Sequence, residues 1–307
     1  MSNLDSISFY GDPTLSDIAE KNVSMFLSHG FLELGAFQNV GSGKLGVEGQ
    51  DLSLLRPVFA TGVSNYRVWR SVPHQWVWES NVTLKYPGGS QPFTPSGIYF
   101  NGTYVPTGSL VSGTGYYIDL NRGQVVFSNP VPSTSVIQVP HANRAIQIYP
   151  MDSNEFRFIE TDWRLANTSG IYDSSAKAYL PAIFLEVRSL NTLKGTELGS
   201  RGKLARAELN FEIFAENAYE LKKLIDILYF LETKSFPFFN LENSPRPLNY
   251  RGELVNTAAT WPIITAQYPY GNARFMEDAI TFKVPNQGAP FFRGRVRIGL
   301  EFDVYPG

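Results

Sequence analysis

The glycine-rich segment 41–46, Gly-Ser-Gly-Lys-Leu-Gly, has the GxGxxG spacing of a dinucleotide-binding turn. In such a site the glycines bring the backbone close to a pyrophosphate, between a strand and the helix that follows it. The next residues, 47–51, do not begin a helix, and Lys44 is followed by Leu45 rather than by the Ser or Thr of a phosphate loop. We therefore interpret 41–46 as a glycine loop and predict no nucleotide cofactor.

Metal-ligand patterns are also weak. The three histidines, His29, His74 and His141, are far apart in sequence, and the chain has no cysteine. A zinc site would therefore need distant carboxylates to converge. The segment 152–155, Asp-Ser-Asn-Glu, begins like a calcium loop, but Phe156-Arg157 stands where acidic and glycine residues belong. We predict no metal site.

Carboxylates offer the one route to catalysis that the sequence leaves open. A pair of acids on a β scaffold could perform glycosidase-type hydrolysis, and the GxSxG motif of a serine hydrolase is absent. The hydrolase alternative would require one of four acids to be buried, paired and pocket-lining; these are Asp152, Glu155, Glu160 and Asp162. Our prediction is a protein without catalytic residues.

Three tryptophans, Trp69, Trp76 and Trp78, lie close together in the sequence. Aromatic platforms stack sugars and bases, so this group supports an alternative function as a carbohydrate-binding or adhesin-like β module. Trp76 and Trp78 alternate with Val77 in a strand-like stretch, which points both rings to the same side. We favour the interpretation that the group fills a core or an interface.

The composition is that of a folded chain rich in strands. The 307 residues suffice for one large or two ordinary domains, and 22 Phe, 16 Tyr, 26 Gly and 20 Pro favour strands joined by tight turns. A net charge of −2 gives no general attraction to nucleic acid. Residues 1–10 lack the basic and apolar regions of a secretory signal, and no apolar run reaches the length of a membrane span.

These patterns predict an α+β fold in three parts. Residues 1–55 form an N-terminal arm, a helix that starts at Asp12-Pro13 and ends at Gly30, and a glycine-rich connector. Residues 56–150 form a β-rich domain. Its clearest hairpin joins Tyr116–Leu120 to Gln124–Phe127 through Asn121-Arg122-Gly123.

Residues 151–307 form the third part, an α+β assembly domain. Apolar and polar residues alternate in Ala205–Ile213 and again in Arg295–Val304, so each should be a strand with one buried face. Between them, Glu216–Glu232 has the apolar stripe of a helix. Further strands are expected at 155–163, 181–190 and 277–284. Repeated prolines predict that 235–251 is an irregular arm on the surface.

Two segments resemble parts of tailed-bacteriophage virion proteins. The strand at 205–213, the helix at 216–232 and the two closing strands, the last of which is Arg293–Val304, resemble the β-α-β-β arrangement of tail-terminator and neck-ring subunits. The segment 115–130 is similar to a hairpin that recurs in phage virion proteins. A minimal terminator has no large β segment in front, so the resemblance leaves connector, terminator, collar and baseplate open.

The resemblance implies a virion structural subunit, synthesised in the cytoplasm of a bacterial host. It implies a ring of identical copies at the neck or tail end, in contact with other neck or tail proteins. DNA would pass through the ring without sequence-specific binding, and no membrane would take part. Heterologous contacts close into rings when the rotation closes. The residues that we expect at subunit interfaces are Phe236, Phe238, Phe239, Arg246, Arg251, Arg295 and Arg297. The polar face of the last strand, where Arg295 and Arg297 lie beside Glu301 and Asp303, could pair with a neighbour's edge.

Overall fold

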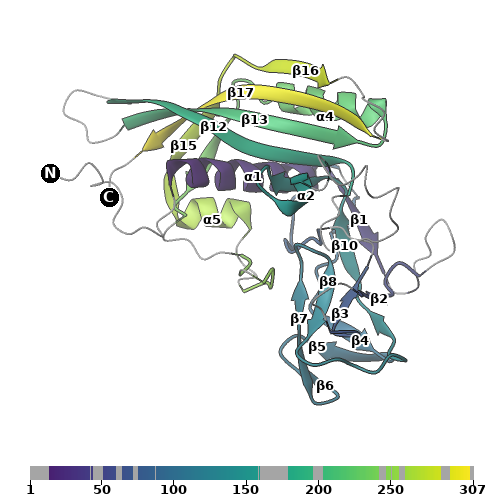
Figure 1. Cartoon of the computed structure of the whole chain (residues 1–307). Helices are drawn as coiled ribbons and strands as arrows, with labels where there is room; N and C mark the ends of the chain where they lie inside the picture. The colour runs from purple at the N-terminus through teal and green to yellow at the C-terminus, as the bar shows by residue number, and fades with distance from the viewer. Residues whose placement is uncertain are drawn as a thin grey trace.

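The computed structural model describes residues 14–41, 43, 51–59, 64–71, 75–86, 88–157, 159, 179–195, 203–241, 247–249, 251–255, 260–284 and 291–304. The fold is α+β, with most of its regular structure in strands. A large sheet with its helices forms one part of the molecule, and a group of short-stranded sheets extends from it (Figure 1).

The large sheet has seven strands. Its order is β11 (Gln147–Pro150), β12 (Ala182–Gly195), β13 (Lys203–Ala215), β17 (Phe292–Val304), β15 (Pro269–Phe275) and β14 (Ser235–Phe239), and β16 (Ile280–Val284) also pairs with β17. All pairs are antiparallel except β11 with β12. β13 and β17 pair along their whole length, from Lys203 opposite Val304 to Ala215 opposite Phe292.

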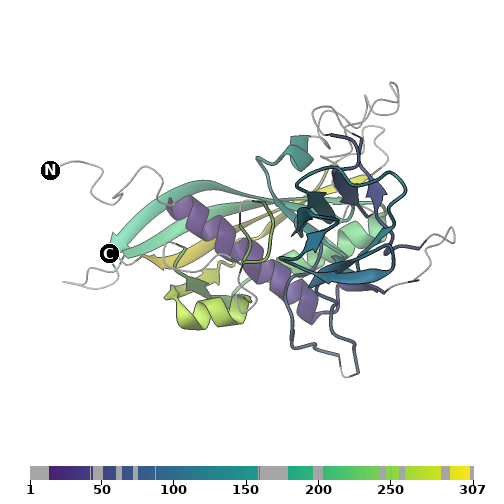
Figure 2. The same cartoon turned by 90° about the horizontal axis from the view of Figure 1, so that it is seen from below.

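The predicted alternation in β13 and β17 is confirmed, because alternate residues of both strands are buried in one core. Helices α1 (Leu15–Glu33) and α4 (Ala218–Tyr229) contribute side chains to this same core. In Figure 2, α1 crosses the sheet diagonally, beside α5 (Trp261–Gln267). Gly294 allows α4 to lie close to β17, since a Cβ there would stand 2.8 Å from Cδ1 of Ile225.

Both predicted ends of the first helix are wrong. The N-cap is Thr14, whose Oγ1 accepts a hydrogen bond from the N–H of Asp17 (3.2 Å), while the Asp17 carboxylate accepts one from the N–H of Thr14 (2.8 Å). Asp12 and Pro13 lie outside the described residues. The helix continues through Gly30, because buried Phe31 and Leu32 extend its apolar face. Gly35, at φ 75°, then ends it.

The smaller part contains the predicted hairpin, formed by β7 (Thr114–Asp119) and β8 (Gln124–Phe127), with Asp119 opposite Gln124. A five-stranded sheet orders β2 (Arg56–Pro57), β3 (Val68–Arg70), β8, β7 and β6 (Leu110–Val111). A three-stranded sheet orders β5 (Thr103–Pro106), β4 (Gly97–Phe100) and β9 (Ile137–Gln138), and β1 (Phe37–Val40) pairs with β10 (His141–Arg144). β11 follows β10 at once and enters the large sheet.

Two predictions in the C-terminal part need correction. The strand expected at 155–163 begins instead as helix α2 (Asn154–Arg157), where the N–H of Phe156 donates to Oγ of Ser153 (3.3 Å); residues 160–163 lie outside the described residues. The arm expected at 235–251 begins with the regular strand β14, which pairs with β15. Pro237 is tolerated because β14 is the last strand at its side of the sheet, where one edge needs no donor.

Candidate functional site

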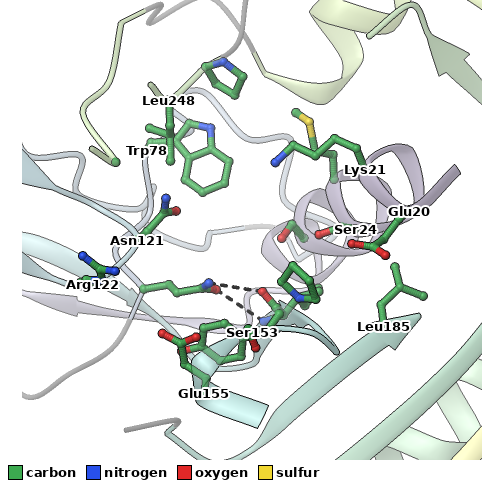
Figure 3. Close-up of a pocket in the computed structure, with 18 of the residues that line it drawn as sticks. Glu20, Lys21, Ser24, Trp78, Asn121, Arg122, Ser153, Glu155, Leu185 and Leu248 are labelled. Atoms are coloured by element: carbon green, nitrogen blue, oxygen red, sulfur yellow. Dashed lines mark hydrogen bonds between the residues drawn. The ribbon is translucent and has the colours of Figure 1, made fainter. Parts of the chain in front are cut away.

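A pocket of about 580 Å³ lies where α1 faces the β7–β8 turn (Figure 3). The first half of α1 supplies Glu20, Lys21 and Ser24, and the turn supplies Asn121 and Arg122. Trp78, Leu248 and Ile148 line its apolar part, and Ser153 and Glu155 of the α2 region line another wall. The pocket is therefore built from both parts of the molecule.

Among the acids that line this pocket, Glu20 has the largest pKa shift. Burial, and after it the negative charges of Asp152 and Asp17, raise its pKa to about 7, against the opposing charge of Lys21. The three acids come from α1 and from the loop before α2, so the fold brings together charges that are far apart in sequence. The carboxyl of Glu20 therefore changes its charge near neutral pH.

Asp119 closes the wall of the pocket at the β7–β8 turn. Its carboxylate accepts hydrogen bonds from the N–H of Arg122 (3.2 Å) and from Nε2 of Gln124 (3.0 Å). Burial raises the pKa of Asp119, and the Arg122 guanidinium opposes that rise. These bonds fix the turn and leave Asp119 with a structural role.

Residues 247–249 and 251–255 return from the C-terminal part and pack on this turn. Oδ1 of Asn249 accepts hydrogen bonds from the N–H groups of Arg251 (2.8 Å) and Glu253 (3.1 Å), which folds the segment into a tight loop. Leu248 and Leu254 pack against the core of the β-rich part. The end of the predicted arm therefore contacts its own chain.

A buried ion network joins α1 to the β-rich part. Glu79 and Arg144 are both almost fully buried, with Oε1 of Glu79 3.5 Å from Nη2 of Arg144. Nδ1 of His29 lies 2.7 Å from the other carboxylate oxygen of Glu79, and the Arg144 guanidinium lies 4.2 Å from the ring centre of Trp78. In the sequence, Glu79 lies 50 residues from His29 and 65 residues from Arg144, so no local pattern predicts this network.

The tryptophan group does not form a ligand platform. Trp69 and Trp76 are 3% and 0% exposed and belong to the core of the β-rich part. The Trp76 ring stacks on buried His141, with ring centres 4.3 Å apart. Only Trp78 reaches the pocket, half-buried and beneath Arg144. The prediction that the group fills a core is confirmed for Trp69 and Trp76.

The predicted interface residues separate into several environments. Phe236, Phe238 and Phe239 are buried in the chain's own cores, so they cannot form a reaching arm. The cause is the pairing of β14 with β15, which turns Phe236 and Phe238 onto α1 and the sheet. Arg246 lies outside the described residues. Arg251 is exposed, and its guanidinium lies 5.6 Å from the ring centre of Tyr117.

Arg295 and Arg297 lie on the polar face of β17, as the alternation predicted. Arg295 and Arg293 bind the buried carboxylate of Glu212, and Arg297 lies over the ring of Phe282 at 5.7 Å. The expected contact of the polar face of β17 with a neighbour's edge stays a prediction. β13 pairs along one side of β17, and β15 and β16 pair along the other, so among the described residues the exposed edge beside β17 is that of β16.

The other residues with chemical potential are placed as follows. Asp152 is exposed and Glu155 half-buried, so neither meets the buried and paired condition of the hydrolase alternative; Glu160 and Asp162 lie outside the described residues. Most of the glycine loop 41–46 and His74 also lie outside them. Among the residues that the structure describes, no three His, Asp or Glu side chains are grouped to hold a metal ion.

The chain matches no protein-family model, and no curated protein matches it. No helix in the described ranges is long and apolar enough to cross a membrane. Chemically, the pocket offers a carboxyl that titrates near neutrality, cations and an apolar wall. Among the described residues, no hydrogen bond connects Glu20 to another side chain.

Proposed function

We propose that the chain is a structural subunit of a tailed-phage virion, which assembles with its own copies into a ring at the neck or tail end. The ring would bridge head and tail components around the DNA passage. One observation carries the proposal: the large sheet has an uncovered stretch of strand edge at each of its two sides, among the described residues. Two different edges on one subunit favour head-to-tail contacts, which close into rings.

The elements on which the resemblance to tail-terminator and neck-ring subunits rests occur in the expected order. They are β13, α4 and the closing strands β16 and β17, with β14, α5 and β15 inserted between α4 and β16. β12 and β13 are long, at 14 and 13 residues, and extend beyond the helices in Figure 1. Long strands suit a subunit that shares its sheet with neighbours.

Charge pairing on the polar face of the sheet is compatible with passing DNA. Nη2 of Arg206 lies 2.7 Å from Oδ2 of Asp278, and Glu212 binds both Arg293 and Arg295. Arginines that are already paired with carboxylates offer few uncompensated charges to phosphate groups. This supports the proposal that DNA passes without being held.

Electron microscopy of the purified full chain at high concentration tests the proposal. We expect uniform rings with an open centre. Single, separate particles at every concentration, or irregular aggregates without a closed form, would contradict it.

A further inference from the structure

Two open edges of the large sheet, that of β16 and that of residues 186–195 of β12, lie at different levels along the strands. β15 and β16 follow one another along one side of β17, and β14 covers β15 alone. Of the described residues, none pairs with the outer edge of β16. At the opposite side, β11 covers Ala182–Leu185 of β12, and residues 186–195 have only β13 as a strand partner in the described part of the chain.

β16 has little of the protection that free edges usually carry. Such edges are normally guarded by charge, proline or a covering segment, because they otherwise pair with another chain. β16 contains one charged residue, Lys283, and no proline, while Ile280 and Phe282 are 54% and 43% exposed. This composition fits a strand that is covered by a partner.

We propose that β16 of one copy pairs antiparallel with residues 186–195 of the next copy, so that the large sheets join around the ring. This inference rests on the proposed function, and it identifies the contact that would close the ring. The occupant is a second copy because this chain carries both halves of the contact.

Strand direction is the first argument for this pairing. β12, β13, β17 and β16 alternate in direction, since each adjacent pair is antiparallel. A neighbour that is related by rotation about an axis roughly parallel to the strands has its strands running in the same directions as those of this copy. Its β12 therefore meets β16 in the antiparallel sense and continues the alternation.

The levels of the two edges then fix the offset between copies. The residue of β17 at the same height serves to compare positions along the sheet. By that measure β16 lies at 293–297, the residues with which it pairs. The open part of β12 runs from Glu186, level with Arg297, to Gly195, level with Val304. All of β16 finds partners only if the neighbour is displaced by about four to seven residues along the strands. β12 has register irregularities between Val187 and Ser189 and between Leu190 and Thr192. Faces still alternate from one paired position to the next, so only an even offset, of about four or six paired positions, keeps polar face beside polar face.

That offset has the geometry of a closed sheet. At ~3.4 Å per residue it amounts to roughly 14 or 20 Å, across four strands spaced ~4.8 Å apart, or roughly 19 Å. The strands would tilt by about 35° or 47°, close to the ~35–45° of closed barrels. The displacement also leaves the neighbour's β11 beyond Val284 and this copy's β14 beyond the neighbour's Gly195, so the covered parts do not collide.

Disulfide mapping tests the contact, because the natural chain has no cysteine. Ser189 is level with Gly299 on the polar face, so it would meet Phe282 at an offset of four and Val284 at an offset of six. We would mix the single variant Ser189→Cys with Phe282→Cys, Val284→Cys or Lys283→Cys, and oxidise mildly. Lys283 is the matched control, since its side chain lies on the other face.

We expect Phe282→Cys or Val284→Cys to form disulfide-linked dimers with Ser189→Cys at least tenfold faster than Lys283→Cys. Each reduced variant should first match the native mass of the wild-type assembly. Amide hydrogen exchange of the wild type gives a second measurement, with 280–284 exchanging at least tenfold more slowly in the assembly than in dilute monomer. Rings without either signal would overturn this contact and leave the proposed function standing, whereas a wild type that stays monomeric would overturn both.

Discussion

The backbone N–H of Leu120 donates a 3.0 Å hydrogen bond to the carbonyl oxygen of Gly252. Leu120 follows β7 in the β-rich part, whereas Gly252 lies in the loop that returns from the C-terminal part. The bond closes one wall of the pocket, and the contact between His29 of α1 and Glu79 joins the parts at a second place. Contacts at two separate places therefore hold the two parts of the chain together.

Gly252→Ala should disrupt the first of these contacts, the hydrogen bond between Leu120 and Gly252. Gly252 has φ 77°, and a Cβ there would collide with Oδ1 of Asp119. We expect a loss of about 2–3 kcal/mol in the free energy of unfolding, from positive-φ strain and the collision together. Gly108→Ala is the control, because Gly108 has φ 85° and open space around it. Equal losses in urea titrations of the two variants would refute the collision.

Arg144→Met should destabilise the fold strongly, because it leaves the Glu79 carboxylate buried without its guanidinium. The expected cost is about 3–5 kcal/mol, and the double variant Glu79→Gln/Arg144→Met should recover part of it. Arg206→Met breaks an exposed pair with Asp278 and should cost less than about 1 kcal/mol. Similar losses in Arg144→Met and Arg206→Met would show that burial of the Glu79 pair has little effect.

His141 should make the protein acid-sensitive. Burial lowers its pKa to about 4, from an ordinary 6.5. The unfolded chain therefore takes up a proton before the folded chain does, so stability is full above pH 6.5 and is lost as the pH falls toward 4. The shift corresponds to about 3 kcal/mol. His141→Phe keeps an aromatic ring beside Trp76, and its stability should fall less between pH 7 and 4 than that of the wild type.

Glu20 should act in the opposite direction. Its raised pKa keeps the folded carboxyl protonated up to about pH 7, so stability falls as the pH rises from 4.5 through 7. Because Glu20 is only partly buried, we expect Glu20→Gln to gain about 1 kcal/mol at pH 8 and little at pH 4.5. Asp152→Asn should lower the Glu20 pKa and give a smaller gain. An equal effect of Glu20→Gln at both pH values, in urea titrations, would contradict a raised pKa.

The fold was predictable where one local pattern decides the structure. Alternation fixed the buried faces of β13 and β17, and the apolar stripe located α4. Phe236 and Phe238 show where local reasoning fails. Their proline-interrupted sequence argues against a strand, but burial against α1 and the sheet outweighs that preference at a strand with one free side.

The candidate site was less predictable, because its properties come from contacts between distant segments. Glu20 has the sequence context of an ordinary helix residue, and its raised pKa comes first from burial and then from the nearby charge of Asp152. Glu79 and Arg144 pair within the β-rich part although they lie 65 residues apart, and His29 of α1 meets Glu79 across the junction of the two parts. The edge of β16 is open because β14 pairs with β15 and not with β16. No residue pattern within β16 indicates which of the two strands β14 would join.

Native mass spectrometry of the full chain, across a range of concentrations, tests most directly whether the protein is a ring subunit. We predict one dominant species whose mass is a fixed multiple of 34.3 kDa and does not grow further as the concentration rises. A species at the mass of one chain at every concentration would contradict the account. A ladder of masses without an end point would also do so, because it would mean an open assembly.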